Sequence, residues 1–176
     1  MGEQLSNLFT FSTINNSNVL SAINSLKNKN CDVLNVPNRI YKLCSQTLAA
    51  PLAKLFNDSI NEGIYPHFLK TAKITPIYKA NGDPILPSNY RPISILPTVG
   101  KIFEKIVYKQ LTNYLNTNNI ISSSQFGFRE GHTTCDAITS FLEQIYKNLN
   151  DKKSSITIYI DLSKAFDTVP HDILIS

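Results

Sequence analysis

Two kinds of hydrophobic spacing alternate along this chain of 176 residues, and together they limit the folds open to it. In four stretches the apolar residues recur every three to four positions, a spacing typical of amphipathic helices. In three shorter stretches, β-branched and apolar residues gather between turn signals, which is typical of strands. A chain with both patterns is expected to be an α+β protein and not an all-helical one.

Capping signals bound the expected helices. Ser17 is a candidate N-cap for the first helix and Thr98 for the third. Thr133, with Asp136 three residues later, resembles a capping box that opens the fourth, with Asp in place of Glu or Gln. The helices are therefore expected over residues 17–26, 45–61, 98–116 and 133–149.

The second expected helix carries two further signals. Gly63 lies just past its end, where a left-handed backbone commonly closes a helix. Pro51 lies inside its apolar pattern; the alternative to one helix over residues 45–61 is that this proline marks a break or the first turn of the helix.

The extended segments fall in the second half of the chain. Residues 72–79 and 90–96 flank the turn signal Asn81-Gly82-Asp83-Pro84, which predicts a hairpin. Pro76 and Pro92 favour edge positions, because proline has no N–H to donate to a sheet.

The last extended segment, residues 156–161, alternates as a strand should. Ile156, Ile158 and Ile160 fall on one face, and Asp161 falls on the other, at the C-terminal end. A carboxylate there could reach a hard cation such as Mg²⁺, which prefers oxygen ligands. It could equally be an ordinary strand-end or turn aspartate. The spacing alone leaves both readings open.

Composition excludes little. A net charge of +4 is compatible with a phosphate backbone but is shared by many unrelated domains. Cys31, Cys44 and Cys135 lack the spacing of a zinc site, and they are expected to be free, buried thiols in a reducing compartment. No apolar run approaches the about 20 residues of a membrane span, and no secretory signal is visible.

Several blocks resemble one family. The segment IYIDLSKAFDTV resembles motif A of reverse transcriptases from non-LTR (LINE-like, jockey-type) retrotransposons. Ser88–Val107 (SNYRPISILPTVGKIFEKIV) and Gln125–Ile138 (QFGFREGHTTCDAI) resemble the first two blocks of that family's fingers subdomain, and Ala72–Pro84 resembles the strand that enters the fingers. The blocks stand in the family's order and at about its spacing. A bacterial or group II intron polymerase is a weaker match to the wording of these blocks.

The resemblance implies an incomplete right-hand polymerase fold, with a fingers subdomain and the first palm strand. Residues 1–60 would be a helical leader region, residues 61–155 the fingers, and residues 156–176 the start of the palm (motif A), truncated. The family's Gly-rich segment and its Tyr/Phe-x-Asp-Asp hairpin, which supplies the remaining metal ligands, are not among these residues.

Functional roles carry over by position in the matching motifs. Asp161 would be the first catalytic carboxylate and would ligate two Mg²⁺ ions, assisted by the Leu162 carbonyl. Phe166 would be the steric gate that favours dNTP over rNTP, with a core aromatic as the alternative. Arg91 and Lys79 would meet the triphosphate, with a surface ion pair and a solvated lysine as the respective alternatives.

A loop before the fourth expected helix would lie along the RNA template. Its candidate template-binding residues are Gln125, Gly127 and Arg129, the last as a phosphate contact. Phe126 and Phe128 are expected to be buried loop anchors and not stacking platforms for bases.

The function implied is that of an RNA-directed DNA polymerase, a nucleotidyltransferase. Its partners would be an RNA template, a DNA primer and dNTP, with no membrane. Its location would be intracellular, in the nucleus or cytoplasm, and the oligomeric state is left unassigned. The chain alone is expected to be inactive, because a lone carboxylate leaves the second metal ion largely unsupported. It is also expected to expose apolar helix faces and to aggregate. The alternative is a non-catalytic nucleic-acid-binding or inert remnant.

Overall fold

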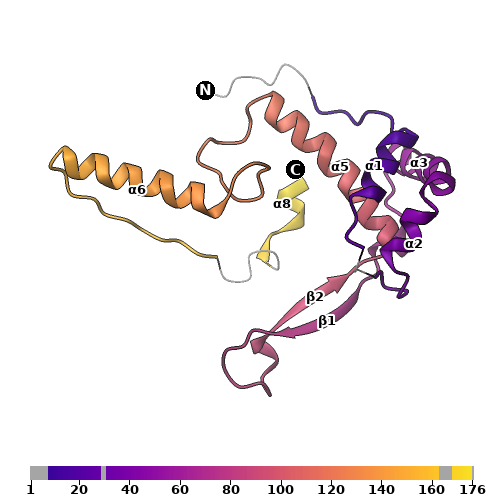
Figure 1. The fold of residues 1–176 in the computed structure, drawn as a ribbon, viewed down its shortest axis with the longest axis horizontal. Helices are drawn as coiled ribbons and strands as arrows, with labels where there is room; N and C mark the ends of the chain where they lie inside the picture. Colours follow the sequence, from indigo (N-terminus) through magenta and orange to yellow (C-terminus); the bar gives the residue numbers. More distant parts are fainter. Residues whose placement is uncertain (1–7, 29–30, 163–167, 176) are drawn as a thin grey trace. The chain divides into compact units, whose positions relative to one another are not determined.

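The computed structural model describes residues 8–28, 31–162 and 168–175 of the chain. In chain order the elements are α1 (Asn16–Asn24), α2 (Asn38–Leu43), α3 (Ser45–Glu62), α4 (His67–Lys70), β1 (Lys73–Tyr78), η1 (Pro87–Asn89), β2 (Tyr90–Ile95), α5 (Thr98–Thr117), α6 (Thr134–Asn150) and α8 (His171–Ile175) (Figure 1). The expected mixture of helix and strand is confirmed. The chain divides into two compact units, Met1–Ile121 and Ser122–Ser176, called here the first unit and the second unit.

The hydrophobic core of the first unit lies where α1, α3 and the first half of α5 meet (Figure 1). Stacked rings mark its centre: the Phe56 ring lies 4.6 Å from that of Phe103, and the Tyr65 ring also stacks on Phe103, at 5.5 Å. The buried apolar side chains are Ile14, Val19, Ala22, Ile23, Ala49, Leu52, Ala53, Phe56, Leu69, Ile102, Phe103 and Ile106. The helical spacing seen in the sequence therefore becomes one shared interior.

Helix α1 begins two residues earlier than expected. Its N-cap is Asn15 and not Ser17, because Asn15 and Asn18 form a reciprocal capping box. The Asn18 N–H donates to the Asn15 side chain at 3.0 Å, and the Asn15 N–H donates to the Asn18 side chain at 3.0 Å. Asparagine caps as well as serine does, so the prediction chose wrongly between two residues of equal capping strength that lie two positions apart.

Helix α3 runs unbroken through Pro51, which is neither a break nor in the first turn. Pro51 is exposed, and so is Thr47, whose carbonyl loses its usual N–H partner and can bind water instead. Gly63 closes the helix with a φ of 66°, as expected, and the Ile64 N–H donates to the Ser59 carbonyl at 3.0 Å.

Helix α5 begins at Thr98, but Thr98 is not its side-chain cap. The Thr98 side chain is fully buried, and its hydroxyl donates to the Asn38 side-chain oxygen at 2.9 Å. The Asn38 amide in turn donates to the Lys27 carbonyl at 3.0 Å. The hydroxyl was mistaken for a cap because its buried partner is 60 residues away in the sequence.

The expected hairpin is confirmed as the antiparallel pair β1–β2, which extends from the helices of the first unit (Figure 1). The register pairs Tyr78 with Tyr90 and Pro76 with Pro92. The Lys79 N–H donates to the Asn89 carbonyl at 2.8 Å, so the hydrogen-bonded rungs fall at every second pair from there. The two prolines therefore share a rung without hydrogen bonds between the strands, and both prolines lie at edge positions as expected.

Helix α6 in the second unit has the capping box expected from its sequence. The Asp136 carboxylate accepts from the Thr133 N–H at 2.6 Å, and the Asp136 N–H donates to the Thr133 hydroxyl oxygen at 3.3 Å. The apolar side of the helix is not buried: Ile138 is 53% exposed and Leu149 is 59% exposed. No described residue of the second unit is buried. The expected exposure of apolar helix faces is thus confirmed.

The expected strand over residues 156–161 is wrong for the chain as described. Residues 153–162 have no regular secondary structure, and Ile156, Ile158 and Ile160 are each more than three-quarters exposed. The alternating pattern suits a strand, but a strand forms only beside a partner that completes its hydrogen bonds. Among the described residues, the only sheet is β1–β2.

The cysteines form no disulfide, as expected, but Cys31, Cys44 and Cys135 are all exposed and not buried. Each lies at or next to the end of an element or in a loop, where no second layer covers it. In the described ranges no helix combines the length and apolar character that crossing a membrane requires.

Candidate active site

Lys79 and Arg91 lie on the same face of the hairpin, near its tip. The register pairs Arg91 with Ile77, and Lys79 follows Ile77 by two residues on a ladder that continues to Asn89. Side chains two residues apart on a strand share a face, so the two cations are diagonal neighbours. The backbone of Arg91 is paired with Ile77 in the ladder, but its exposed side chain makes no hydrogen bond or ion pair with the residues that the structure describes. Its guanidinium is thus available for a ligand.

Lys79 has a structural contact that the sequence did not suggest. Its ammonium group donates to the Ser88 carbonyl at 2.6 Å, across the loop that joins the two strands. Lysine carries three N–H donors, so this contact leaves two for a ligand. Lys79 therefore closes the tip loop and still presents its charge beside Arg91.

Two tyrosines brace the tip from the opposite face. Tyr78 and Tyr90 are paired in the register, with ring centroids 5.4 Å apart. The Tyr78 hydroxyl donates to the Gly82 carbonyl, and the Tyr90 hydroxyl donates to the Pro84 carbonyl at 2.9 Å. This brace was not predicted, although aromatic residues on both sides of a predicted turn were a visible signal.

Glycine is required at the centre of the tip loop. Gly82 has a φ of 82°, and a Cβ at this position would lie 2.6 Å from the Asn89 side-chain nitrogen. That nitrogen donates to the Asp83 carbonyl at 2.8 Å. The loop that separates Lys79 from Arg91 in the sequence is thus held by its own hydrogen bonds.

The candidate template residues share one loop of the second unit. The Gln125 side-chain amide donates to the Gly127 carbonyl at 3.3 Å. One guanidinium nitrogen of Arg129 donates to the Ser122 carbonyl at 3.2 Å, across the base of the loop. Arg129 is half-buried and partly engaged in closing the loop, so only part of its guanidinium is open to a phosphate.

The two phenylalanines of this loop differ. Phe126 is half-buried and lies 5.9 Å from the His132 ring, as expected of an anchor. Phe128 is 92% exposed, so the expectation that it is a buried anchor is wrong. Its backbone has a φ of 58°, a left-handed conformation that is strained for a bulky residue.

Asp161 and Leu162 lie at the end of the irregular segment that follows α6. Both are exposed, and Leu162 is 72% so. Phe166 lies outside the described residues. The candidate catalytic carboxylate is thus open to solvent at the end of a segment without a strand partner.

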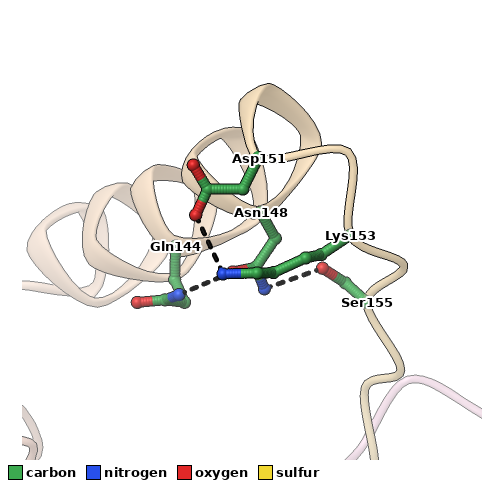
Figure 2. A network of polar contacts seen from close by, with 5 residues as sticks. All are labelled: Gln144, Asn148, Asp151, Lys153 and Ser155. Carbon is green, nitrogen blue, oxygen red and sulfur yellow. Dashed lines mark hydrogen bonds and ion pairs between the residues drawn. The ribbon is translucent and has the colours of Figure 1, made fainter.

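The start of this segment is fixed by the end of α6 (Figure 2). The Asn148 amide donates to the Ser155 hydroxyl at 3.0 Å and accepts from the Gln144 amide at 3.0 Å. Lys153 forms an ion pair with Asp151 at 3.1 Å, and its N–H donates to the Asn148 carbonyl at 2.8 Å. These contacts set the direction in which the chain leaves the helix toward Asp161.

The described residues supply only some of the ligands that a metal site needs. The Asp161 carboxylate is a hard oxygen donor in an accessible position, and the Leu162 carbonyl is the next one along the chain. Among the described residues, no three His, Cys, Asp or Glu side chains gather to hold an ion. Asp161 therefore fits one ligand of a divalent metal site and cannot complete the site.

The structure brings the candidate residues together in two separate groups. Lys79 and Arg91 are neighbours in the first unit, and Gln125, Gly127 and Arg129 share a loop of the second. A surface hollow of about 340 Å³ between residues 8–12 and the second half of α5 contains none of these candidates.

A protein-family model matches the part of the chain that contains the candidate residues. Residues 77–176 match the family model described as reverse transcriptase (RNA-dependent DNA polymerase). The matched range begins inside β1 and contains Lys79, Arg91, the template-loop candidates and Asp161. It covers more than half of the chain.

Individual relatives agree with the family match. The chain is 32% identical over 159 residues to a probable RNA-directed DNA polymerase from transposon BS of Drosophila melanogaster, covering 90% of the chain and 18% of that protein. It is 31% identical over 134 residues to the RNA-directed DNA polymerase from mobile element jockey of the same species, covering 76% of the chain and 15% of the relative. The chain therefore spans less than a fifth of the length of these curated relatives.

Proposed function

The chain belongs to the reverse transcriptase family of RNA-dependent DNA polymerases, and we propose that it contributes the fingers and the first palm strand of such an enzyme in a LINE-like retrotransposon. The observation that carries this proposal is the family match over residues 77–176, which contains every candidate site residue. The reaction proposed is extension of a DNA primer by dNTP on an RNA template. In this proposal residues 1–60 form the leader, residues 61–155 the fingers and residues 156–176 the start of the palm of a right-hand fold.

The paired cations of the hairpin suit the nucleotide. Arg91 and Lys79 share one face of a braced tip, where a guanidinium fork and an ammonium can bind the oxygens of a triphosphate together. The Tyr78–Tyr90 brace holds the backbone of the tip loop, and the Ser88 carbonyl holds the Lys79 ammonium group, before the nucleotide arrives. Binding a charged ligand at a tip whose backbone is already positioned lowers the entropy lost on binding.

Asp161 is the proposed first catalytic carboxylate, with Leu162 contributing its carbonyl and Phe166 acting as the gate against a ribose 2′-hydroxyl. Reverse transcriptases generally use divalent metal ions, and for this chain Mg²⁺ is the ion we propose. When bound, such ions supply Lewis-acid stabilisation of charge on the reacting phosphate. What the chain itself supplies is one accessible carboxylate at the end of a segment rich in isoleucine.

Gln125, Gly127 and Arg129 are proposed to lie along the RNA template. The loop that carries them is closed by its own hydrogen bonds, so it offers backbone groups and part of one guanidinium to a phosphate chain. An intracellular location, in the nucleus or cytoplasm, follows from the proposed template.

Primer extension tests the proposal most directly. The chain would be expressed through the whole reading frame in which it occurs and supplied with RNA template, DNA primer, dNTP and Mg²⁺. We expect extension that falls by several orders of magnitude in Asp161→Asn, because removal of a metal ligand acts on the chemical step. Glu143→Gln, a change of an exposed carboxylate on α6, serves as the matched control and should retain activity.

The results for the Asp161 variant and for the control variant can be distinguished. Equal loss in both variants, or full activity of Asp161→Asn, would contradict the role of Asp161. For residues 1–176 alone we expect no extension, and measurable synthesis by that chain would show this expectation to be wrong.

A second candidate function is supported by the distribution of charge. The first unit contains twelve Lys and Arg against six Asp and Glu, a net charge of +6, whereas the second unit contains five against seven, a net charge of −2. A non-catalytic chain could therefore still hold RNA through phosphate contacts made by the first unit.

Binding of a labelled single-stranded RNA, measured by fluorescence anisotropy over a salt series, tests this second function. We expect affinity that falls steeply with salt and does not depend on Mg²⁺. Arg91→Ala should reduce the salt slope by about one phosphate contact, whereas Arg39→Ala, on the exposed side of α2, should not. Binding that is independent of salt would exclude the phosphate-contact reading.

A further inference from the structure

The segment that precedes α1, residues 8–14, is neither helix nor strand, yet side-chain amides hold its backbone. Gln110 of α5 binds Ser12 twice: the Ser12 N–H donates to the Gln110 oxygen at 2.8 Å, and the Gln110 nitrogen donates to the Ser12 carbonyl at 3.0 Å. The two bonds pair a side-chain amide with a peptide group in the way that two peptide groups pair in an antiparallel sheet.

Asn57 of α3 repeats this arrangement two residues later. The Ile14 N–H donates to the Asn57 oxygen at 2.8 Å, and the Asn57 nitrogen donates to the Ile14 carbonyl at 2.8 Å. In an extended chain the N–H and C=O groups of residues i and i+2 point to the same side. Two amides from two helices thus take the place of successive rungs of a neighbouring strand.

Gln110 and Asn57 bind only the backbone of this segment, and among residues 12–14 only the Ile14 side chain is buried. Ile14 is 2% exposed and belongs to the core, whereas Ser12 and Thr13 are exposed. Upstream, the Phe9 ring lies 5.3 Å from the Tyr114 ring. The surface hollow of about 340 Å³ lies beside this contact, so the second half of α5 is only partly covered.

We propose that α3 and α5 form a binding site for an extended peptide, which residues 9–14 of this chain occupy as a tethered ligand. In this site Gln110 and Asn57 form hydrogen bonds with the peptide backbone, and one aliphatic side chain is buried in the place of Ile14. An aromatic side chain five residues before that position packs on Tyr114, and the hollow leaves room for a larger one. The same segment of a second copy of the chain carries all of these features and can occupy the site in trans.

This mode of recognition has physical consequences. A backbone-reading site tolerates many sequences, because the hydrogen bonds are the same for any residue other than proline, and specificity falls on the one pocket. The tethered segment competes with any free one, because its effective concentration is high. The site should therefore become available to a free peptide only when the binding of residues 9–14 is weakened. The inference does not depend on polymerase activity.

A peptide-binding experiment with the full chain tests it. Ile14→Asp places a charge in the buried pocket, and Ser12→Pro removes the N–H that donates to Gln110, so both variants should release the tethered segment to different degrees. A fluorescein-labelled peptide of residues 8–16 would be titrated into each chain and followed by anisotropy. We expect saturable binding that is strongest for Ile14→Asp, weaker for Ser12→Pro and at least tenfold weaker for the wild-type chain.

Second-site variants show whether the peptide binds where we propose. Gln110→Leu in the Ile14→Asp chain should weaken binding by about tenfold, because two hydrogen bonds are lost. Gln46→Leu, a change of an exposed glutamine on α3, is the matched control and should leave binding unchanged. Equal weakening by both changes would overturn the assignment.

Folding is checked by circular dichroism. If Ile14→Asp loses its helical signal, Ser12→Pro decides the question, with and without Gln110→Leu. Absence of peptide binding by a folded chain carrying either release variant would overturn the proposal.

Discussion

The two compact units of this chain differ in what their apolar residues contact. Among the described residues of the first unit, α1, α3 and α5 together with Ile14 and Leu69 bury twelve apolar side chains in one core, around the stacked rings of Phe56 and Phe103. In the second unit α6 has an equally clear apolar side, but no described residue is buried. Helical periodicity is therefore sufficient to form α6 but not to bury it, because burial needs a second apolar surface.

The same difference appears in the hydrogen bonds. Polar groups of the first unit bind partners far away in the sequence, such as Thr98 with Asn38 and Gln110 with Ser12. In the second unit, the hydrogen bonds at the end of α6 join residues that are at most seven positions apart. We infer that the first unit unfolds cooperatively and that the second is a set of local structures, whose stability depends on a covering surface.

Removing a ring from each unit should give the largest contrast. Phe56→Ala should lower the free energy of unfolding by about 3–5 kcal/mol, because it leaves a cavity in the core. Phe141→Ala removes a ring that is 37% exposed on α6 and should shift the main unfolding transition by less than about 1 kcal/mol. Urea unfolding followed by circular dichroism measures both. Similar shifts for the two variants would contradict the difference between the units.

A buried carboxylate provides the next test. Asp32 is 3% exposed and accepts hydrogen bonds from the Leu34 N–H, the Val36 N–H and the Tyr41 hydroxyl. Burial opposes its charge, but these bonds, with Lys101 nearby, outweigh burial and lower the pKa of Asp32 below its ordinary value of 3.8. Asp32→Ala should therefore reduce the free energy of unfolding by about 3 kcal/mol, because three donors lose their acceptor.

The lowered pKa also fixes a pH dependence. A carboxyl whose pKa is lower in the folded state stabilises the fold above its unfolded pKa, and that stability is lost as the pH falls through the folded value. The free energy of unfolding should thus decline below about pH 4 in the wild-type chain and decline less steeply in Asp32→Asn. Identical acid profiles for the two chains would remove Asp32 as the cause.

Two capping boxes allow a matched comparison of smaller size. Asn15→Ala removes the cap of α1 and should lower the global free energy of unfolding by about 1 kcal/mol. Thr133→Ala removes the cap of α6 and should speed amide exchange in its first turn without moving the main transition. A global shift of the same size for Thr133→Ala would mean that α6 folds together with the first unit.

The smallest effects are expected just after the C-terminal ends of two helices. Lys152 follows α6 with a φ of 57°, a left-handed conformation that glycine adopts more easily. Lys152→Gly should stabilise the end of α6 by about 0.5 kcal/mol, since the relief of strain exceeds the added freedom of glycine. Gly63→Ala, at the matching position after α3, should destabilise the first unit by about 1 kcal/mol. Local amide exchange and urea unfolding, respectively, measure these changes.

The sequence predicted those features that depend on neighbouring residues. The capping box at Thr133 and Asp136, the end of α3 at Gly63 and the β1–β2 hairpin were all visible in local patterns. Thr98 was misread as a cap because a hydroxyl shows its buried partner only after the chain has folded. The strand over residues 156–161 failed for a related reason, because alternation specifies a strand only where a partner strand is present.

The candidate site was predictable to a similar degree. Motif order identified Lys79 and Arg91 as a pair, but their shared face required the register, which an eleven-residue loop conceals. The tyrosine brace and the use of the Lys79 ammonium in closing the loop could not be read from spacing. Whether Asp161 gains further ligands depends on groups that the described residues do not bring together.

The facing prolines of the hairpin have a consequence for assembly. Pro76 and Pro92 share a rung at which their nitrogens point outward, one on each long side of the ribbon. Neither nitrogen carries a hydrogen, so an incoming strand finds a missing donor at mid-length on whichever side it approaches. The ribbon is thereby protected from stacking edge to edge with other ribbons into fibrils, even though Ile74 and Ile93 remain exposed on its faces. The β1–β2 hairpin can in this way project without pairing to another hairpin, and Lys79 and Arg91 at its tip remain accessible.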